Sequence, residues 1–381
     1  MESLLMIPRY AIPFLLVLSV LVFVHEMGHY LVARLCGVRV EAFSIGFGKK
    51  LFGFTDKHGT NWKICMIPLG GYVQMFGDAD PTSSKVSVDE IQVMSPEQRK
   101  EAFFFKPVWQ RALIVFAGPA INFLYALVVM SILFAVQGQI YAPAEVGGLV
   151  EDGPAAKAGF ELGDKVLSIN GVPLESFQEL QRQVGINLGT EMVFQVQRKD
   201  QQLTLKTMPG VLEQEDNFGF KHRVGRIGVM SVGNTAIKKH TPGSAVIAAA
   251  EDMWSMTLAT LRAMGQMITG VRSTDELGGV IRIGAYAKEF SDAGALSLLM
   301  FSALISINLG LINLFPIPLL DGGHLLFYFY EAIAGRPMPE KLRMAGLKLG
   351  YILVVTLMIY ATFNDLLQLK VFDFIAAKLG S

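Results

Sequence analysis

The sequence predicts a polytopic α-helical membrane protein with four transmembrane helices, a membrane-associated β-hairpin region after the first helix, and a folded domain inserted after the second. The support is an apolar composition, four stretches almost free of charge, and a long polar segment between the second and third stretches. Of the 381 residues, 52% are apolar and 17% are charged, whereas soluble domains average about 25% charged residues. Lys plus Arg and Asp plus Glu balance at 33 each, so no net charge favours a nucleic-acid partner. The 2 cysteines are too few for a disulfide-built secreted scaffold.

The four charge-poor stretches are the predicted transmembrane helices, at residues 8–34, 111–137, 293–330 and 345–368. About 20 apolar residues cross a bilayer, so the first three are long enough and the fourth is short but workable. Glu26 is the only formally charged residue between Tyr10 and Ala33, and Asp321 stands alone in the third stretch. The first stretch runs into His-Glu rather than a small-residue cleavage site, so it is not a cleaved signal peptide.

Lys and Arg residues predict the orientation, because positive charge near span ends marks cytoplasmic connections. They flank the connection after the first span and occupy the short turn before the fourth: Arg34, Arg39, Lys49, Lys50, Arg99, Lys100, Lys106 and Arg111, then Arg336, Lys341 and Arg343. Both connections are therefore expected in the cytoplasm. The two termini and the long segment between the second and third spans are expected on the outer side.

The long outer segment contains the pattern of a small folded domain. Residues 163–171 alternate like a strand and run into an Asn-Gly turn. A short helix is expected over 176–184, with strands over 190–197 and 201–208. Residues 153–174, GPAAKAGFELGDKVLSINGVPL, resemble the bacterial PDZ pattern, which occurs once in the chain.

That resemblance implies one PDZ domain at 139–212, with a peptide-binding loop at Val146, Gly147, Gly148 and Leu149. A connector follows at 213–292. Within it, residues 244–269 keep helical apolar spacing but include Glu251, Asp252 and Arg262. This favours an amphipathic helix that lies on the membrane or against the PDZ domain over a fifth span.

The cytoplasmic, membrane-associated region at 35–110 contains an apolar, β-prone stretch, WKICMIPLGGYVQMF at 62–76, interrupted by Pro68 and Gly70-Gly71. Two interpretations stay open. The stretch is a hairpin packed under the helices, or it is a membrane-inserted hairpin whose free edge pairs with an extended peptide.

His25-Glu26-Met27-Gly28-His29 lies at the inner end of the first span. On a helix the two histidines share one face a turn apart and can bind one ion, while Glu26 can take a proton from a metal-bound water. Ionisable residues inside a membrane are costly and usually functional. The alternative is a buried polar cluster whose members satisfy one another without a metal.

Asp321 is the third candidate ligand, since a catalytic zinc has three protein ligands and an open position. The surrounding residues 313–324, NLFPIPLLDGGH, contain two prolines and two glycines and cannot form an unbroken helix. Such a break is tolerated in a membrane where it lines a cavity. His324 is a rival ligand, although a supporting or interface role suits it better. The remaining histidines lie in polar connections, and no metal role is expected for them: His58, His222 and His240.

HEMGH, FAGPAINF at 116–123 and NLFPIPLLDGGH at 313–324 together resemble the site-2 protease family of intramembrane zinc metalloproteases. With the PDZ domain, the chain is similar to the bacterial regulator-of-sigma-E type, although some relatives carry two PDZ domains. The resemblance implies Zn²⁺ held by His25, His29 and Asp321, with Glu26 as general base. It also implies substrate binding by Asn313 and by the hairpin edge at Gly70, Gly71 and Tyr72, and packing of the second span against the site by Gly118, Pro119 and Asn122. For Asn122, a polar bridge between two helices is an equally good interpretation.

The function implied is an endopeptidase of the bacterial inner membrane that cuts single-pass membrane proteins in regulated intramembrane proteolysis. The implied substrates are a trimmed anti-sigma factor, prepared by an upstream site-1 protease, and signal-peptide remnants. The active site would face the cytoplasmic side of the bilayer and the PDZ domain the periplasm. Two alternatives are a membrane scaffold that binds protein termini and a metal transporter, which ranks last because the ionisable residues gather at one level.

Overall fold

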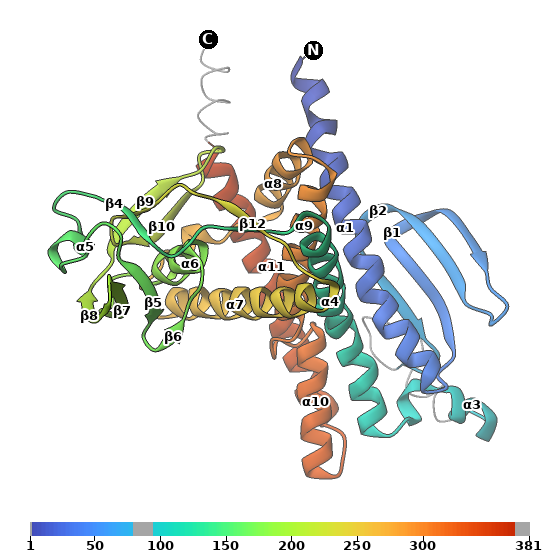
Figure 1. The fold of residues 1–381 in the computed structure, drawn as a ribbon. Coiled ribbons are helices and arrows are strands. Elements are labelled where there is room, and N and C mark those ends of the chain that lie inside the picture. The colour runs from blue at the N-terminus through green and yellow to red at the C-terminus, as the bar shows by residue number, and fades with distance from the viewer. Residues whose placement is uncertain (1, 79–93, 370–381) are drawn as a thin grey trace. The chain divides into compact units, whose positions relative to one another are not determined.

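The computed structural model describes residues 2–78 and 94–369. The chain forms two compact units, Met1–Val129 with Arg282–Tyr360 and Met130–Ile281 with Ala361–Ser381. The first unit is mainly helical, and the second contains most of the strands (Figure 1).

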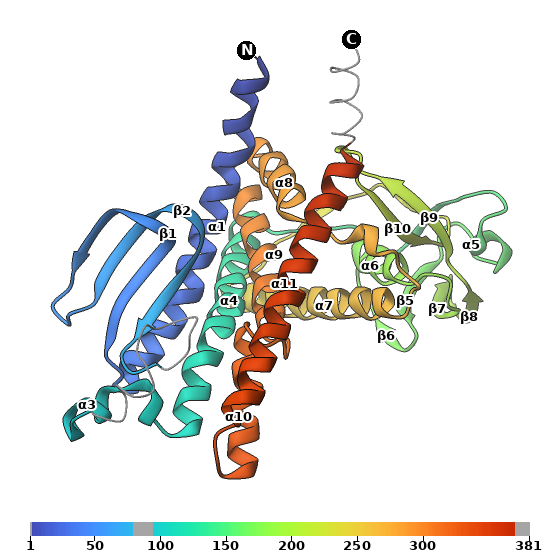
Figure 2. The same ribbon diagram turned by 180° about the vertical axis from the view of Figure 1, so that it is seen from behind.

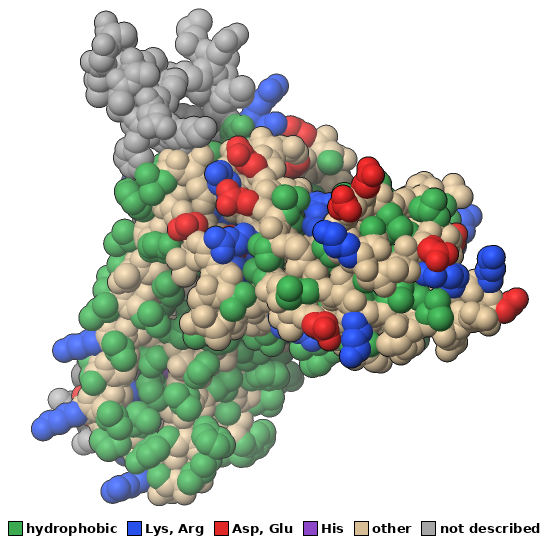
Figure 3. Space-filling model, turned by 90° about the vertical axis from the view of Figure 1, so that its left-hand side faces the viewer, with side chains coloured by type: hydrophobic (Ala, Val, Ile, Leu, Met, Phe, Trp, Pro, Cys, Tyr) green, Lys and Arg blue, Asp and Glu red, His purple; other side chains and the backbone are tan. Residues whose placement is uncertain are grey.

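Long apolar helices build the first unit. They are α1 (Glu2–Leu35), α4 (Val108–Gln137), α9 (Ala295–Asn313), α10 (Asp321–Ala334) and α11 (Glu340–Gln368), of which α4 and α11 continue into the second unit. Within the described residues, α4, α9, α11 and the Arg9–Leu35 part of α1 are long and apolar enough to cross a membrane. Each of them overlaps one predicted span, although α9 covers only the first part of the third, 293–330. In Figure 3, hydrophobic side chains cover much of the helix surface of the first unit, whereas most Lys, Arg, Asp and Glu side chains lie on the second unit.

The third predicted span is broken, as expected from its prolines and glycines. Helix α9 ends at Asn313 and α10 begins at Asp321. The intervening loop folds back over the start of α10, where a Cβ on Gly322 would lie 2.5 Å from the carbonyl carbon of Leu314 and one on Gly323 2.6 Å from Cα of Pro318. Only glycine fits these two positions, and the loop can therefore place Asp321 at the first turn of a new helix.

Two long antiparallel strands, β1 (Val40–Thr55) and β2 (Asn61–Met75), form a β region beside α1 (Figure 2). Residues 42–45 of β1 pair on one side with 71–74 and on the other with 61–64. The predicted β-hairpin region is therefore present, but β1 and β2 form the hairpin, and the chain does not turn back within 62–76. Gly70-Gly71 do not form a turn but belong to one bent strand, whose partner is 40–55. The short helices α3 (Pro96–Glu101) and η1 (Phe103–Phe105) follow.

A buried core joins this sheet to the helices of the first unit. It includes Val40, Phe43 and Val73 from the sheet, Ala33 from α1 and Ile114 from α4. Ring stacking of Phe43 on Trp62, with centroids 4.5 Å apart, adds to the same core. The sheet edge at 71–75 is thereby held against the helix that carries the HExxH residues.

The second unit begins with the domain predicted from the PDZ resemblance. Its elements are β3 (Gln139–Tyr141), β4 (Val146–Leu149), α5 (Pro154–Lys157), β5 (Lys165–Ile169), β6 (Val172–Pro173), α6 (Phe177–Ile186), β7 (Met192–Arg198), β8 (Gln201–Thr207), β9 (Gly210–Glu215), β10 (Lys221–Arg226), β11 (Val229–Ser231) and β12 (Ala236–Lys238). Strands β6-β5-β7-β8 form one sheet in that order. Asn170 and Gly171 both have positive φ, 50° and 80°, as a two-residue hairpin turn requires. The predicted helix and strands of this domain are confirmed.

The folded domain extends beyond the predicted boundary at 212. Strand β4 pairs with β11 and β3 pairs with β12, and Ile227 belongs to the domain core. A boundary at 212 would strip two strands of their partners. The late strands were missed because they are short and largely exposed, which leaves little apolar alternation in the sequence.

Helix α7 (Pro242–Ile268) confirms the amphipathic helix expected at 244–269. It packs on the domain through Arg182 of α6, whose guanidinium lies 3.0 Å from Asp252, and through Gln266, which donates to the Ile186 carbonyl. Ile247 and Trp254 are 62% and 65% exposed. The short helix η2 (Thr274–Glu276) and helix α8 (Val280–Asp292) lead back to the first unit.

Candidate metal centre

Helix α1 places two imidazoles on one face. The Nε2 atoms of His25 and His29 lie 3.3 Å apart, and the ring centroids are separated by 4.9 Å. This is the arrangement expected for two residues four positions apart on a helix. Glu26 lies on the same turn.

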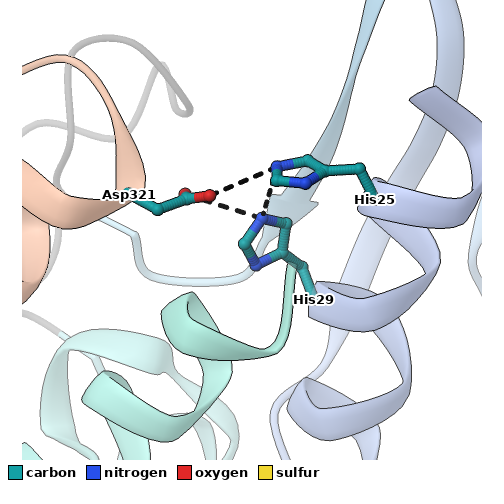
Figure 4. A group of neighbouring side chains, drawn as sticks. All are labelled: His25, His29 and Asp321. Atoms are coloured by element: carbon teal, nitrogen blue, oxygen red, sulfur yellow. Dashed lines mark hydrogen bonds and ion pairs between the residues drawn. The ribbon is translucent and has the colours of Figure 1, made fainter. Parts of the chain in front are cut away.

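Asp321, the first residue of α10, faces both imidazoles (Figure 4). Its Oδ2 lies 3.2 Å from Nε2 of His25, and its Oδ1 lies 3.6 Å from Nε2 of His29. One ligand atom from each residue lies within 4.8 Å of the others, and no other such group of three occurs at residues 2–78 and 94–369.

The three side chains do not fully satisfy one another by hydrogen bonds, and their free atoms could bind a cation. Oδ2 of Asp321 is buried and makes no hydrogen bond, even though a histidine nitrogen is 3.2 Å away. A buried carboxylate oxygen without a donor is costly. Two imidazoles, one carboxylate and an open side are the ligand set of a catalytic zinc, so these residues fit the metal that the sequence implies.

Helix α4 closes over the back of the two histidines. Nδ1 of His29 lies 2.9 Å from the Ile114 carbonyl oxygen, which can only accept, so Nδ1 carries the proton and Nε2 is free to bind an ion. A Cβ on Gly118 would lie 2.5 Å from Cε1 of His29 and 2.9 Å from Cε1 of His25. Glycine at 118 is therefore what allows α4 to approach the histidines this closely.

A cavity of about 250 Å³ opens beside the three residues. It is lined by His25, Glu26, His29, Gly71, Tyr72, Val73, Met75, Asp78, Phe103, Val115, Leu319, Asp321, His324 and Tyr328. A Cβ on Gly71 would lie 3.2 Å from Cγ of Glu26. The sheet edge at 71–75 thus runs directly past the glutamate.

The structure brings together some of the predicted substrate-binding residues and not others. Gly71 and Tyr72 line the cavity, whereas Gly70 and Asn313 do not. Asn313 is half-buried at the last position of α9. His324 lines the cavity but does not belong to the three-residue group, which agrees with a supporting role.

In the inserted domain, the predicted peptide-binding loop at 146–149 is strand β4, paired with β11. An apolar groove of about 420 Å³ lies instead between α6 and the segment 224–230, and none of the four predicted residues lines it. Its lining includes Leu180, Val184, Ile227 and Met230. The Ile227-Gly228-Val229 run, which leads into β11, was the available signal in the sequence.

Sequence analysis also missed a second cavity, of about 300 Å³, that shares Asp78, Phe103, His324 and Tyr328 with the first. Its wall contains a bidentate ion pair in which Nη2 of Arg111 lies 2.6 Å from Oε1 of Glu331. In the sequence analysis, Arg111 was used only as one of the positive charges that predict the membrane orientation. Its distant partner, 220 residues along the chain, could not be inferred from spacing.

Helices long and apolar enough to span a bilayer, together with an HExxH helix whose histidines meet an aspartate, define a metalloprotease-type membrane protein. The chain belongs to Peptidase family M50, whose sequence pattern matches residues 13–357. The chain is therefore a peptidase of the metal-dependent class.

Relatives cover almost the whole chain. A Mesorhizobium japonicum protein named "Putative zinc metalloprotease" is 42% identical over 358 residues, which is 93% of this chain and 98% of that protein. Metalloprotease MmpA of Caulobacter vibrioides is 36% identical over 382 residues, covering 95% and 96%. The PDZ domain of an SdrC-like protein from Listeria monocytogenes aligns with 22% identity over 24% of this chain and 90% of that chain, but the TM-score of 0.19 does not establish a shared fold.

Proposed function

We propose that the chain is a zinc-dependent intramembrane endopeptidase that cleaves single-pass membrane proteins in regulated intramembrane proteolysis. The observation that carries the proposal is the convergence of His25, His29 and Asp321, with an orphaned carboxylate oxygen, at the ends of apolar helices. The names of the M50 relatives support zinc as the metal.

The three side chains would hold the ion, and Glu26 is the general base. When bound, zinc supplies Lewis acidity that polarises the scissile carbonyl and acidifies a water. Glu26 lines the same cavity as the ligands. It can therefore accept the proton of the attacking water and return it to the leaving amine nitrogen.

The edge of β2 at 71–75 is the proposed docking strand for the substrate. A helical substrate must unwind locally before its carbonyl can be attacked, because helix hydrogen bonds hide the backbone. In the described residues this stretch pairs with β1 on one side only, and Gly71 and Tyr72 line the cavity. Pairing with an extended segment would offset part of the cost of unwinding.

Asn313 keeps its proposed role in binding the substrate backbone, although it lies outside the cavity lining. The inserted domain is proposed to face the periplasm of the bacterial inner membrane, with the metal centre toward the cytoplasm. The Lys and Arg residues of the two connections support this orientation. The domain would admit an anti-sigma factor only after an upstream site-1 protease has trimmed it, and signal-peptide remnants are the second proposed substrate class.

The test is co-expression with a tagged single-pass model substrate that lacks its outer domain. A cytoplasmic fragment is expected with the wild-type chain and none with Glu26→Gln, which removes the base and keeps the metal ligands. Glu191→Gln, an exposed position in the second unit, is the matched control and should cut normally. If Glu26→Gln releases the same fragment as wild type, the assigned base and mechanism are wrong.

A further inference from the structure

We infer that Asn122 is a positioning residue that fixes the tautomer of His25 by accepting a hydrogen bond from Nδ1–H. This inference rests on the proposed metal centre. Asn122 is completely buried, at 0% exposure, and its amide nitrogen lies 3.0 Å from Nδ1 of His25. It acts through the histidine and touches neither metal nor substrate.

A neutral histidine carries its proton on one ring nitrogen and has a lone pair on the other. Both Nε2 atoms face Asp321, so ion binding requires the proton of each ring on Nδ1. For His29 the Ile114 carbonyl already enforces this tautomer. His25 needs an acceptor at the equivalent place.

Asn122 can be that acceptor after a half-turn of its amide. With the nitrogen toward Nδ1, the amide would donate to Nδ1 and force the His25 proton onto Nε2. A protonated Nε2 could not bind an ion. Oδ1 of Asn122 is buried and has no hydrogen-bond partner, so no neighbour in the described residues holds the amide in that sense. The two ends of an amide have nearly the same shape and are assigned from their partners. Here the partner is Nδ1–H of His25, so the end of the amide that faces it is assigned as Oδ1.

The spacing of residues along α4 supports this role for Asn122. Ile114, Gly118 and Asn122 are spaced by four, so they lie on one face of α4. That face supplies His29 with a carbonyl, both rings with space, and His25 with an amide. Ser306 of α9 donates to the backbone carbonyl of Asn122 at 2.9 Å. The bridge between helices is therefore made by the backbone, which leaves the side chain for His25.

The test compares Asn122→Leu, which has a similar shape but no acceptor, with Asn122→Asp, which keeps an acceptor. Zinc affinity of each purified full-length protein is measured by competition with a chelator. Loss of a hydrogen-bond partner of a metal ligand typically weakens binding by about 10–100-fold, and this is expected for Asn122→Leu. Asn122→Asp should bind zinc at least as well as wild type. Ser306→Ala removes the contact between α4 and α9 and should leave zinc affinity unchanged.

A second measurement reports the tautomer itself. In metal-free protein labelled with ¹⁵N-histidine, His25 should be protonated at Nδ1 in wild type and in Asn122→Asp, and should become a mixture in Asn122→Leu. Unchanged zinc affinity in Asn122→Leu, or equal losses in the Leu and Asp variants, would overturn the inference. If zinc affinity is unaffected by His25→Ala, the metal centre itself is wrong, and the NMR spectra still decide whether Asn122 is an acceptor.

Discussion

Two aspartates with buried carboxylate oxygens, one in each unit, differ in how those oxygens are paired. In the inserted domain, Asp164 is 0% exposed and accepts from Arg198 at 2.7 and 2.8 Å and from the Glu161 amide at 2.9 Å. In the helical unit, Asp321 faces two imidazole nitrogens, yet its Oδ2 has no hydrogen-bond donor. Protein donors therefore pair both oxygens of Asp164, whereas Oδ2 of Asp321 can still accept a bond.

The contrast separates a structural charge from a functional one. Most buried carboxylates that only support the fold are paired, because an unpaired one is expensive. Where a carboxylate is buried beside histidines and left short of donors, the deficit is what a cation would fill. The comparison therefore gives a physical reason for assigning chemistry to Asp321 and none to Asp164.

The largest expected effect comes from exchanging these carboxylates for amides. Asp321→Asn should abolish peptidase activity and weaken zinc binding by more than about 100-fold, since losing a ligand costs more than losing a ligand's partner. Asp164→Asn is the matched control and should retain full zinc occupancy. Metal analysis of the purified variants checks both, and wild-type zinc content in Asp321→Asn would remove the distinction between the two sites.

Close packing at the metal centre predicts the next effect. Gly118→Ala would push a methyl group into the His29 and His25 rings, and should destabilise the protein by about 1–3 kcal/mol and weaken zinc binding by about tenfold or more. Gly284→Ala, in the middle of α8 with nothing within 4 Å of the added carbon, should instead stabilise by about 0.5–1 kcal/mol. Thermal unfolding and chelator competition measure both. Equal behaviour of the two variants would show that α4 does not confine the histidines.

The metal centre was largely predictable from the sequence because its chemistry demands particular residues at particular spacings. HEMGH on an apolar stretch predicts two ligands and a neighbouring base, and a lone Asp321 amid prolines and glycines predicts a broken helix. Charge-free stretches likewise predict long apolar helices. These features depend on local sequence or on the cost of charge in lipid, so one chain is enough to infer them.

What could not be predicted depends on which distant segments meet. The partner of 62–76 is 40–55 because a strand bends instead of turning at Gly70-Gly71. The partner of β4 is β11, more than 70 residues later. Asn122 illustrates the same limit: its sequence context favours helix packing, but its function depends on which ring nitrogen it meets.

The strand pairing in the inserted domain predicts how it can be removed. Gln139 pairs with Lys238, so the ends of the segment lie side by side and a short Gly-Ser linker can replace 139–238. This deletion should keep cleavage of an already trimmed substrate and add cleavage of an untrimmed one. Deleting only 143–212 removes β4 and leaves β11 without its partner, although β3 and β12 can still pair. This shorter deletion should lower expression and stability. Failure of the 139–238 deletion to cut even the trimmed substrate would show that the domain is needed for catalysis rather than for selection.

The smallest expected effect is the pH dependence of the paired carboxylate. Burial alone would raise the pKa of Asp164, but hydrogen bonds from Arg198 and the Glu161 amide, with the charge of Arg198, lower it below its ordinary value. A depressed folded pKa stabilises the domain above the unfolded value of about 3.9, and this stability is lost as pH falls towards the folded value. Asp164→Asn should cost about 1–3 kcal/mol at neutral pH and lack this acid-dependent loss. Hydrogen exchange of β5 and β7 amides in the full chain, corrected for intrinsic exchange rates, measures both effects. A variant that loses protection with acid as steeply as wild type would show that Asp164 is not the charge that the domain stabilises, and the contrast with Asp321 would then rest on geometry alone.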